Sequence, residues 1–104
     1  ELRQRAGDLQ LAPLREKAAA IRSAGLSSAT ASAFVDAALD SASELAFRFW
    51  CSEAREAIAS LPTEAATPIY HLLTRSIAAA SRLLRRQREH LIAVLAAAVA
   101  PVAA

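Results

Sequence analysis

The sequence predicts an all-α protein with two long antiparallel helices and a short N-terminal helix. About a quarter of its 104 residues are alanine, the strongest helix former, and it contains only 2 glycines. Apolar residues recur at spacings of three and four, and no stretch alternates as a strand does. Prolines and serines bound three helical segments, at about residues 13–24, 29–60 and 68–99. We expect one domain over residues 1–104.

The first predicted helix, residues 13–24, begins at Pro13 and ends before Gly25. Proline is tolerated in the first turn of a helix, because the backbone N–H groups there have no partner within the helix. Glycine adopts the left-handed conformation that often follows a helix. Ser27 or Ser28 then caps the next helix, since a serine side chain accepts hydrogen bonds from free N–H groups.

The second predicted helix spans residues 29–60, because nothing in it breaks a helix before Pro62. At 1.5 Å per residue it would be roughly 45 Å long. The third predicted helix, residues 68–99, takes Thr67–Pro68 as its N-cap and first helical residue, and it ends before Pro101. The short connection between the two makes an antiparallel hairpin.

Apolar stripes along the two long helices are expected to face each other across this hairpin. The stripe of the first is Phe34, Val35, Ala38, Leu39, Ala42, Leu45, Ala46, Phe49, Trp50, Ala57, Ile58 and Leu61. The stripe of the second is Ile69, Tyr70, Leu73, Ile77, Ala80, Leu84, Leu91, Leu95 and Val99. Because a two-helix hairpin buries little surface, we expect a homodimer in which two hairpins form a four-helix arrangement.

Several apolar residues lie outside these stripes and are candidates for an interface with another protein. Leu72, Leu83 and Val94 lie about 100–140° from the centre of their stripe on a helical wheel. Phe47 and Cys51 are expected to point away from the core, although burial of the cysteine beside the tryptophan is the commoner arrangement. The predicted interface residues are Phe47, Cys51, Leu72, Leu83, Arg82, Arg86, His90 and Val94.

Four arginines fall within the seven residues from Arg82 to Arg88. On a continuous helix one group would form a ridge, namely Arg75, Arg82, Arg85 and Arg86. Arg88 would instead point along the apolar stripe and need a partner for its head group. In the antiparallel hairpin Arg86 is level with Glu44. The ridge is either solvated and partly paired with Asp40 and Glu44, or it steers an acidic partner protein.

Residue types that catalyse reactions or bind metals are scarce in this chain. Its two histidines, His71 and His90, are nineteen residues apart, and Cys51 is its single cysteine. No glycine-rich loop, HExxH motif or cysteine–histidine spacing is present. We therefore expect no enzymatic activity, metal, cofactor or small-molecule substrate.

The chain is also expected to be cytoplasmic, without direct binding to DNA or membranes. A single cysteine suits a reducing compartment, and the charged N-terminus is unlike a signal peptide. The longest apolar run, Leu91 to Ala104, is shorter than the roughly 20 residues of a membrane span. A net charge of +2 and a short alanine-rich segment after Arg88 do not match a basic arm with a leucine zipper.

Short motifs near the helix ends carry a resemblance to a known family. SLPTE (Ser60 to Glu64) closes one long helix, LIAVL (Leu91 to Leu95) with Pro101 closes the next, and GLSS…FVDAAL (Gly25 to Leu39) leads into the first. In this order, which covers about three quarters of the chain, they resemble the small all-helical antiactivators of LuxR-type quorum-sensing regulators. The Arg82–Arg88 cluster departs from the TraM-like members, and the composition is more similar to the QslA-like ones.

The resemblance implies a dimer that binds a LuxR-type, LasR-like transcription regulator and prevents its dimerisation or DNA binding. No binding residue is carried over, because the matching positions belong to hinges and core. The residues themselves leave two alternatives open. One is a small helical chaperone or structural subunit of a secretion or other assembly. The other is direct nucleic-acid binding through the arginines of the ridge.

Overall fold

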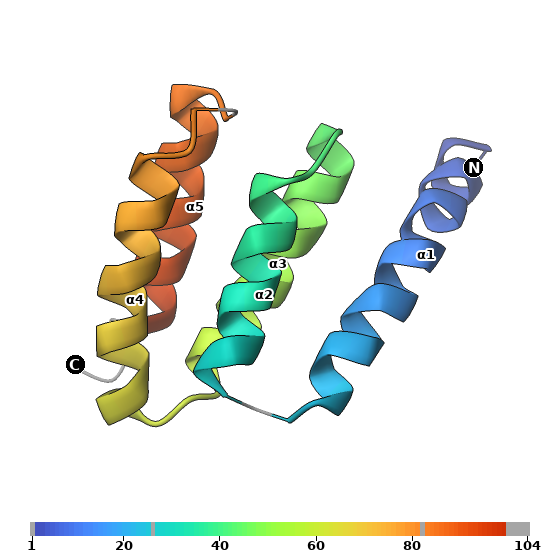
Figure 1. Cartoon of the computed structure of the whole chain (residues 1–104). Coiled ribbons are helices and arrows are strands. Elements are labelled where there is room, and N and C mark those ends of the chain that lie inside the picture. The colour runs from blue at the N-terminus through green and yellow to red at the C-terminus, as the bar shows by residue number, and fades with distance from the viewer. Residues whose placement is uncertain (1, 26, 82, 100–104) are drawn as a thin grey trace.

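The computed structural model describes residues 2–25, 27–81 and 83–99, with side chains described from residue 11 onward, and it is all-helical (Figure 1). The described helices are α1 (Leu2–Ser23), α2 (Ser28–Leu39), α3 (Glu44–Ala59), α4 (Thr63–Ala78) and α5 (Arg85–Val99). Each helix runs antiparallel to the one before it in the sequence, whereas α3 and α5 run in the same direction (Figure 1). The predicted all-α class is confirmed.

The segment expected to be one helix over residues 29–60 is two helices, α2 and α3, separated by residues 40–43. The side chain of Ser43 accepts a hydrogen bond of 3.1 Å from a backbone N–H in the first turn of α3. The hydroxyl of Ser41 donates to the carbonyl oxygen of Ala37 at 2.9 Å. Serine side chains that bond nearby backbone groups compete with the helix's own hydrogen bonds. The expectation of a continuous helix is therefore wrong for a local reason.

The segment expected to be one helix over residues 68–99 is also divided, into α4 and α5. The guanidinium of Arg88, on α5, donates to two carbonyl oxygens of the connection between these helices. The acceptors are Ala80 at 3.0 Å and Leu83 at 2.7 Å. Arg88 thus has the partner that its position required. The alanines before the break favour a helix, so tertiary contacts rather than local propensity account for it.

Two predicted helix starts are wrong. The first helix begins at Leu2, so Pro13 lies inside α1 rather than in its first turn. The helix expected to start at Pro68 starts instead at Thr63, directly after Pro62. The carbonyl oxygen of Pro62 accepts hydrogen bonds of 2.9 and 2.8 Å from two backbone N–H groups of this first turn. The fixed φ of Pro62, −59°, suits the entry into a helix.

Three local signals in the sequence act as predicted. Pro62 follows the end of α3, whose C-cap is Ser60. Gly25 has a φ of 103°, the left-handed conformation expected after α1. The side chain of Ser27 caps α2 by accepting a hydrogen bond from the backbone N–H of Thr30 at 3.4 Å.

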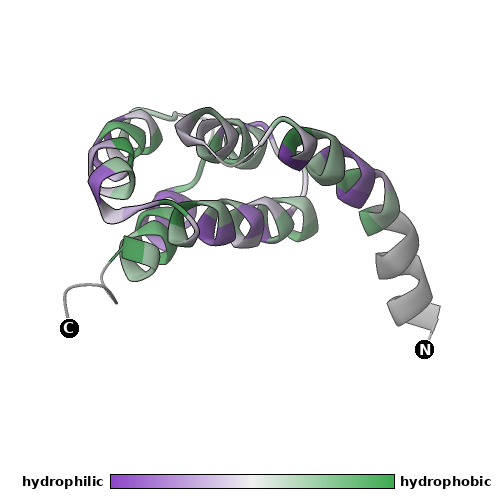
Figure 2. Ribbon diagram, turned by 90° about the horizontal axis from the view of Figure 1, so that it is seen from below, coloured by the Kyte–Doolittle hydropathy of each residue, from purple (hydrophilic) through white to green (hydrophobic). Residues whose placement is uncertain are grey.

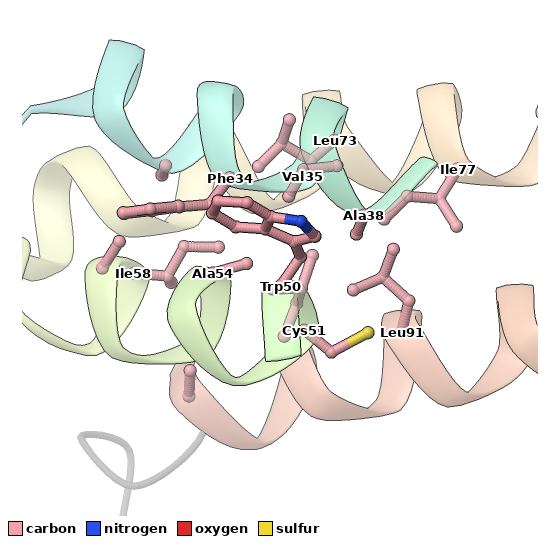
Figure 3. Close-up of a cluster of buried hydrophobic side chains, with 14 of the residues drawn as sticks. Phe34, Val35, Ala38, Trp50, Cys51, Ala54, Ile58, Leu73, Ile77 and Leu91 are labelled. Atoms are coloured by element: carbon pink, nitrogen blue, oxygen red, sulfur yellow. The ribbon is translucent and has the colours of Figure 1, made fainter. Parts of the chain in front are cut away.

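One chain forms the four-helix arrangement that we expected from two copies. Helix α2 packs against α3 and α4, and α5 packs against α3 and α4, while α1 lies at the edge of this group (Figure 2). The larger buried apolar side chains are Phe34, Val35, Phe47, Trp50, Ile58, Ile69, Leu73, Ile77, Leu83, Leu91 and Leu95. Figure 3 shows Trp50 beside Phe34, with Cys51 directed toward Leu91.

Helix α1 is attached to the group by apolar and ionic contacts. Its buried Ala18 and half-buried Leu14 and Ile21 pack against the core. The guanidinium of Arg22 forms ion pairs with Glu53 and, at 2.9 Å, with Glu56 of α3. Burial raises the pKa of the Glu53 carboxyl, an effect that Arg22 opposes. Within the described residues, no helix has the length and hydropathy needed to cross a membrane.

Candidate protein-binding site

The first turns of α3 and α5 lie side by side, because the two helices run in the same direction (Figure 1). A cleft between them is lined by Glu44, Phe47, Arg48, Arg86, Gln87 and His90. We call it the basic cleft. It brings together three of the predicted interface residues, Phe47, Arg86 and His90. It also places Arg86 and Glu44 together, as expected, although between parallel rather than antiparallel helices.

Glu44 is the carboxylate of the basic cleft, and its contacts are long. Its Oε1 lies 3.8 Å from Nε of Arg48, and its Oε2 lies 3.4 Å from Nε2 of Gln87. Charge-assisted hydrogen bonds between nitrogen and oxygen are usually about 2.7–2.9 Å long. Glu44 therefore neutralises the positive charge of the cleft only weakly.

Gln87 connects the basic cleft to the start of α5. While its Nε2 donates to Glu44, its Oε1 accepts a hydrogen bond of 2.9 Å from the backbone N–H of Leu84. This bond satisfies one of the N–H groups that precede a helix without a partner. The amide side chain of Gln87 thus links the beginning of α5 with the beginning of α3.

Phe47 lies beneath the ring of His90. The two ring centroids are 6.4 Å apart, and His90 is exposed, whereas Phe47 is only 2% exposed. The expectation that Phe47 points away from the core is wrong. Since the chain folds back between α2 and α3, the inward face of α3 is not the continuation of the inward face of α2. Phe47 supports the cleft from inside instead of anchoring a partner.

Positive charge exceeds negative charge in the basic cleft. The guanidinium groups of Arg48 and Arg86 share it with the single carboxylate of Glu44. Within the described part of the chain, Arg86 makes neither a hydrogen bond nor an ion pair. The N-terminal ends of two helix dipoles add to the positive potential. The geometry suits an anionic group of a ligand or partner.

A second hollow continues from the basic cleft toward the connection between α2 and α3. It shares Glu44, Arg86 and Gln87 with the cleft, and Leu83 also lines it. Leu83 was expected at the surface, but it is only 6% exposed, because the chain turns inward before α5. Leu83 is therefore a core residue at the edge of the site.

The remaining predicted interface residues are dispersed. Leu72 is exposed on α4, Val94 is half-buried on α5, and Cys51 is buried. Arg82 lies outside the described residues. The expected arginine ridge is also wrong, because the break after α4 puts Arg75 and Arg86 on different helices.

Sequence reasoning missed two exposed leucines. Leu84, which was assigned to the inward stripe, is 58% exposed directly before α5. Leu45, also assigned to a stripe, is exposed at the start of α3. Leu84 lies at the end of one break in the expected helices, and Leu45 lies just after the other. A helical wheel drawn through a break no longer predicts which side chains face inward. The Asp-Ser-Ala-Ser run at residues 40–43 could have revealed the first break.

Cys51 is expected to be almost unreactive in the folded protein. Burial, with a smaller effect of Glu44, raises the pKa of its thiol to about 12. At pH 8 only about one thiol in ten thousand would be ionised, and the thiolate is the reactive form. A colour-forming disulfide reagent should label the native protein far more slowly than the urea-unfolded chain. Labelling at equal rates would show that the thiol is accessible.

The raised pKa of the Cys51 thiol also makes the stability of the protein depend on pH. The folded protein holds the thiol proton more tightly than the unfolded chain, whose pKa is near 9.0. This contribution to stability is complete below pH 9 and is lost as the pH rises toward 12. Cys51→Ala should remove that part of the alkaline loss in urea titrations.

The chain matches no protein family model, no curated protein and no solved structure. Among the described residues, no group of three histidine, cysteine, aspartate or glutamate side chains is placed to hold a metal ion.

Proposed function

We propose that the chain is a non-enzymatic antiactivator. In this proposal it binds and sequesters a LuxR-type, LasR-like transcription regulator and blocks its dimerisation or DNA binding. The resemblance of the SLPTE and LIAVL segments suggests the class of partner. The observation that supports protein binding is the exposure of Leu84, 58%, directly before α5, whose first turns line the basic cleft.

Leu84 and the basic cleft have the composition of a protein interface. An exposed leucine provides apolar area, and nearby arginines provide charge and directed hydrogen bonds. Gln87 holds the two together, since it bonds the backbone of Leu84 and lines the cleft. A partner that covers Leu84 would therefore also approach Arg86.

We further propose a homodimer that uses a different surface. Leu72 is 57% exposed on α4, whereas the basic cleft lies between α3 and α5. A second copy that covers Leu72 would leave the cleft free for the regulator. The dimer is not needed to complete the core, because one chain already packs four helices.

Co-expression with a panel of LuxR-type regulators tests both proposals. We expect the tagged protein to retain a regulator and to abolish its gel shift on promoter DNA. Leu84→Glu should weaken capture of the regulator and leave the dimer intact in light scattering. Leu72→Glu should convert a dimer to a monomer in light scattering and leave capture intact. Each variant serves as the control for the other.

A folded monomer at micromolar concentration would exclude the homodimer. Failure to retain any regulator would exclude the antiactivator. A pull-down from the native cell, with partners identified by mass spectrometry, would then test the alternative of a helical chaperone or assembly subunit.

A further inference from the structure

We propose that the basic cleft receives a carboxylate side chain from an acidic segment of the partner protein. Glu44 fills this place in the free protein and is displaced on binding. The inference deepens the proposed function and rests on it only in taking the partner to be a protein. It does not depend on which protein that is.

The internal carboxylate of the basic cleft is poorly held. Glu44 reaches Arg48 only at 3.8 Å and Gln87 only at 3.4 Å, and the pair with Arg48 is exposed to solvent. Exposed ion pairs of this kind contribute about 0–1 kcal/mol. Displacing Glu44 therefore costs little.

The basic cleft also has unused capacity for an anion. Arg86 lines it without an ion pair within the described residues, and Arg48 keeps most of its donors free. The hollow has a volume of about 180 Å³, whereas one water molecule requires about 10–15 Å³ by the same measure. It can hold the end of one acidic side chain, to which a guanidinium can donate two parallel hydrogen bonds.

The charge distribution of the chain favours a protein over a nucleic acid as the partner. Nucleic-acid binding needs cations spaced along a phosphate backbone, and the net charge of this chain is only +2. Arg75, which would have extended the basic surface, is on α4 rather than beside Arg86. The exposed Leu84 also offers a contact that an apolar side chain of a partner protein can use and that a phosphate backbone cannot.

The test measures fluorescence anisotropy of a labelled amphipathic peptide with glutamates on one face and leucines on the other. A matched peptide carries glutamine in place of every glutamate. We expect the acidic peptide to bind and the glutamine peptide to bind about tenfold more weakly. Arg48→Gln and Arg86→Gln should each weaken the acidic peptide by about fivefold. Arg75→Gln removes the same charge from α4 and should have no effect.

Glu44→Gln is the most discriminating variant, because we expect it to increase the affinity for the acidic peptide. Removing the internal carboxylate should strengthen binding of the acidic peptide by about threefold. Circular dichroism melts of every variant confirm that the helices remain folded. A loss of binding in Glu44→Gln, or equal binding by all variants, would overturn the inference.

Duplex DNA that carries the same fluorescent label is measured in parallel, to test the alternative of nucleic-acid binding. DNA binding that depends on Arg48 and Arg86, together with no binding of the acidic peptide, would make the cleft a nucleic-acid site and overturn the inference. The peptide experiment contains no regulator. If the peptide results hold while no LuxR-type regulator is captured, the cleft inference stands and the proposed function fails. If a LuxR-type regulator is captured while the peptide results fail, the proposed function stands and the cleft inference fails.

Discussion

Trp50→Ala is expected to lower the free energy of unfolding by about 3–5 kcal/mol, the usual loss for a buried aromatic side chain. Trp50 is 3% exposed and lies between α2 and α3. Its ring centroid is 5.9 Å from that of Phe34 and 5.0 Å from that of Phe49. The ammonium group of Lys17 on α1 lies 5.8 Å from the same ring. The substitution would therefore loosen three helices together.

Urea unfolding followed by circular dichroism measures this loss. Domains of this size have about 5–15 kcal/mol of total stability, so the alanine variant retains only part of it. Trp50→Phe keeps one aromatic ring in the core and should cost less. Arg55→Ala, at an exposed position of the same helix, should change stability by less than about 1 kcal/mol. Equal losses at Trp50 and Arg55 would contradict the described core.

Arg88→Met is expected to cost about 2–3 kcal/mol, although it keeps an apolar stem of similar length. The substitution removes the donors to the carbonyl oxygens of Ala80 and Leu83, which lie in the connection between α4 and α5. Hydrogen bonds that involve a charged group contribute about 1.5–3 kcal/mol. The Ala80 carbonyl keeps the backbone N–H of Leu83 as a donor, whereas the part-buried Leu83 carbonyl loses the guanidinium and adds a penalty. Amide hydrogen exchange at the start of α5 should accelerate in parallel.

Arg85→Met is the matched control. Arg85 differs by three positions on the same helix, and its guanidinium only bonds the exposed Glu89 at 3.2 Å. Pairs of this spacing on a helix surface contribute about 0.3–0.5 kcal/mol. If both methionine variants lose the same small amount, the contacts of Arg88 do not stabilise the turn.

The sequence predicted much of the core and little of the surface. Phe34, Trp50, Ile69, Leu73 and Leu91 were assigned to inward stripes and are buried. Trp50 and Leu91 remain on the inward face although they lie after the breaks in the expected helices. The assignments at Leu84 and Phe47 are wrong, because Leu84 lies within the break before α5 and Phe47 lies on a part of α3 that turns inward after the break before it.

The basic cleft was predicted only in part. Arg86, His90 and Phe47 were candidates, and the level of Glu44 with Arg86 was expected. Arg48 and Gln87 were not candidates, because neither belongs to the apolar residues outside the stripes or to the arginine ridge. Their meeting depends on the parallel course of these helices, which follows from two reversals of the chain (Figure 1).

By itself the sequence determined that the chain is helical and where several helices end. Pro62, Gly25 and Ser27 act on backbone groups within about four residues, so their effects can be recognised locally. Only the tertiary structure decided the reversal between α4 and α5. Alanine favours a continuous helix there, and the reversal instead depends on burial of Leu83 and Leu91 and on Arg88 bonding a carbonyl eight residues earlier. Such contacts exist only once the helices pack.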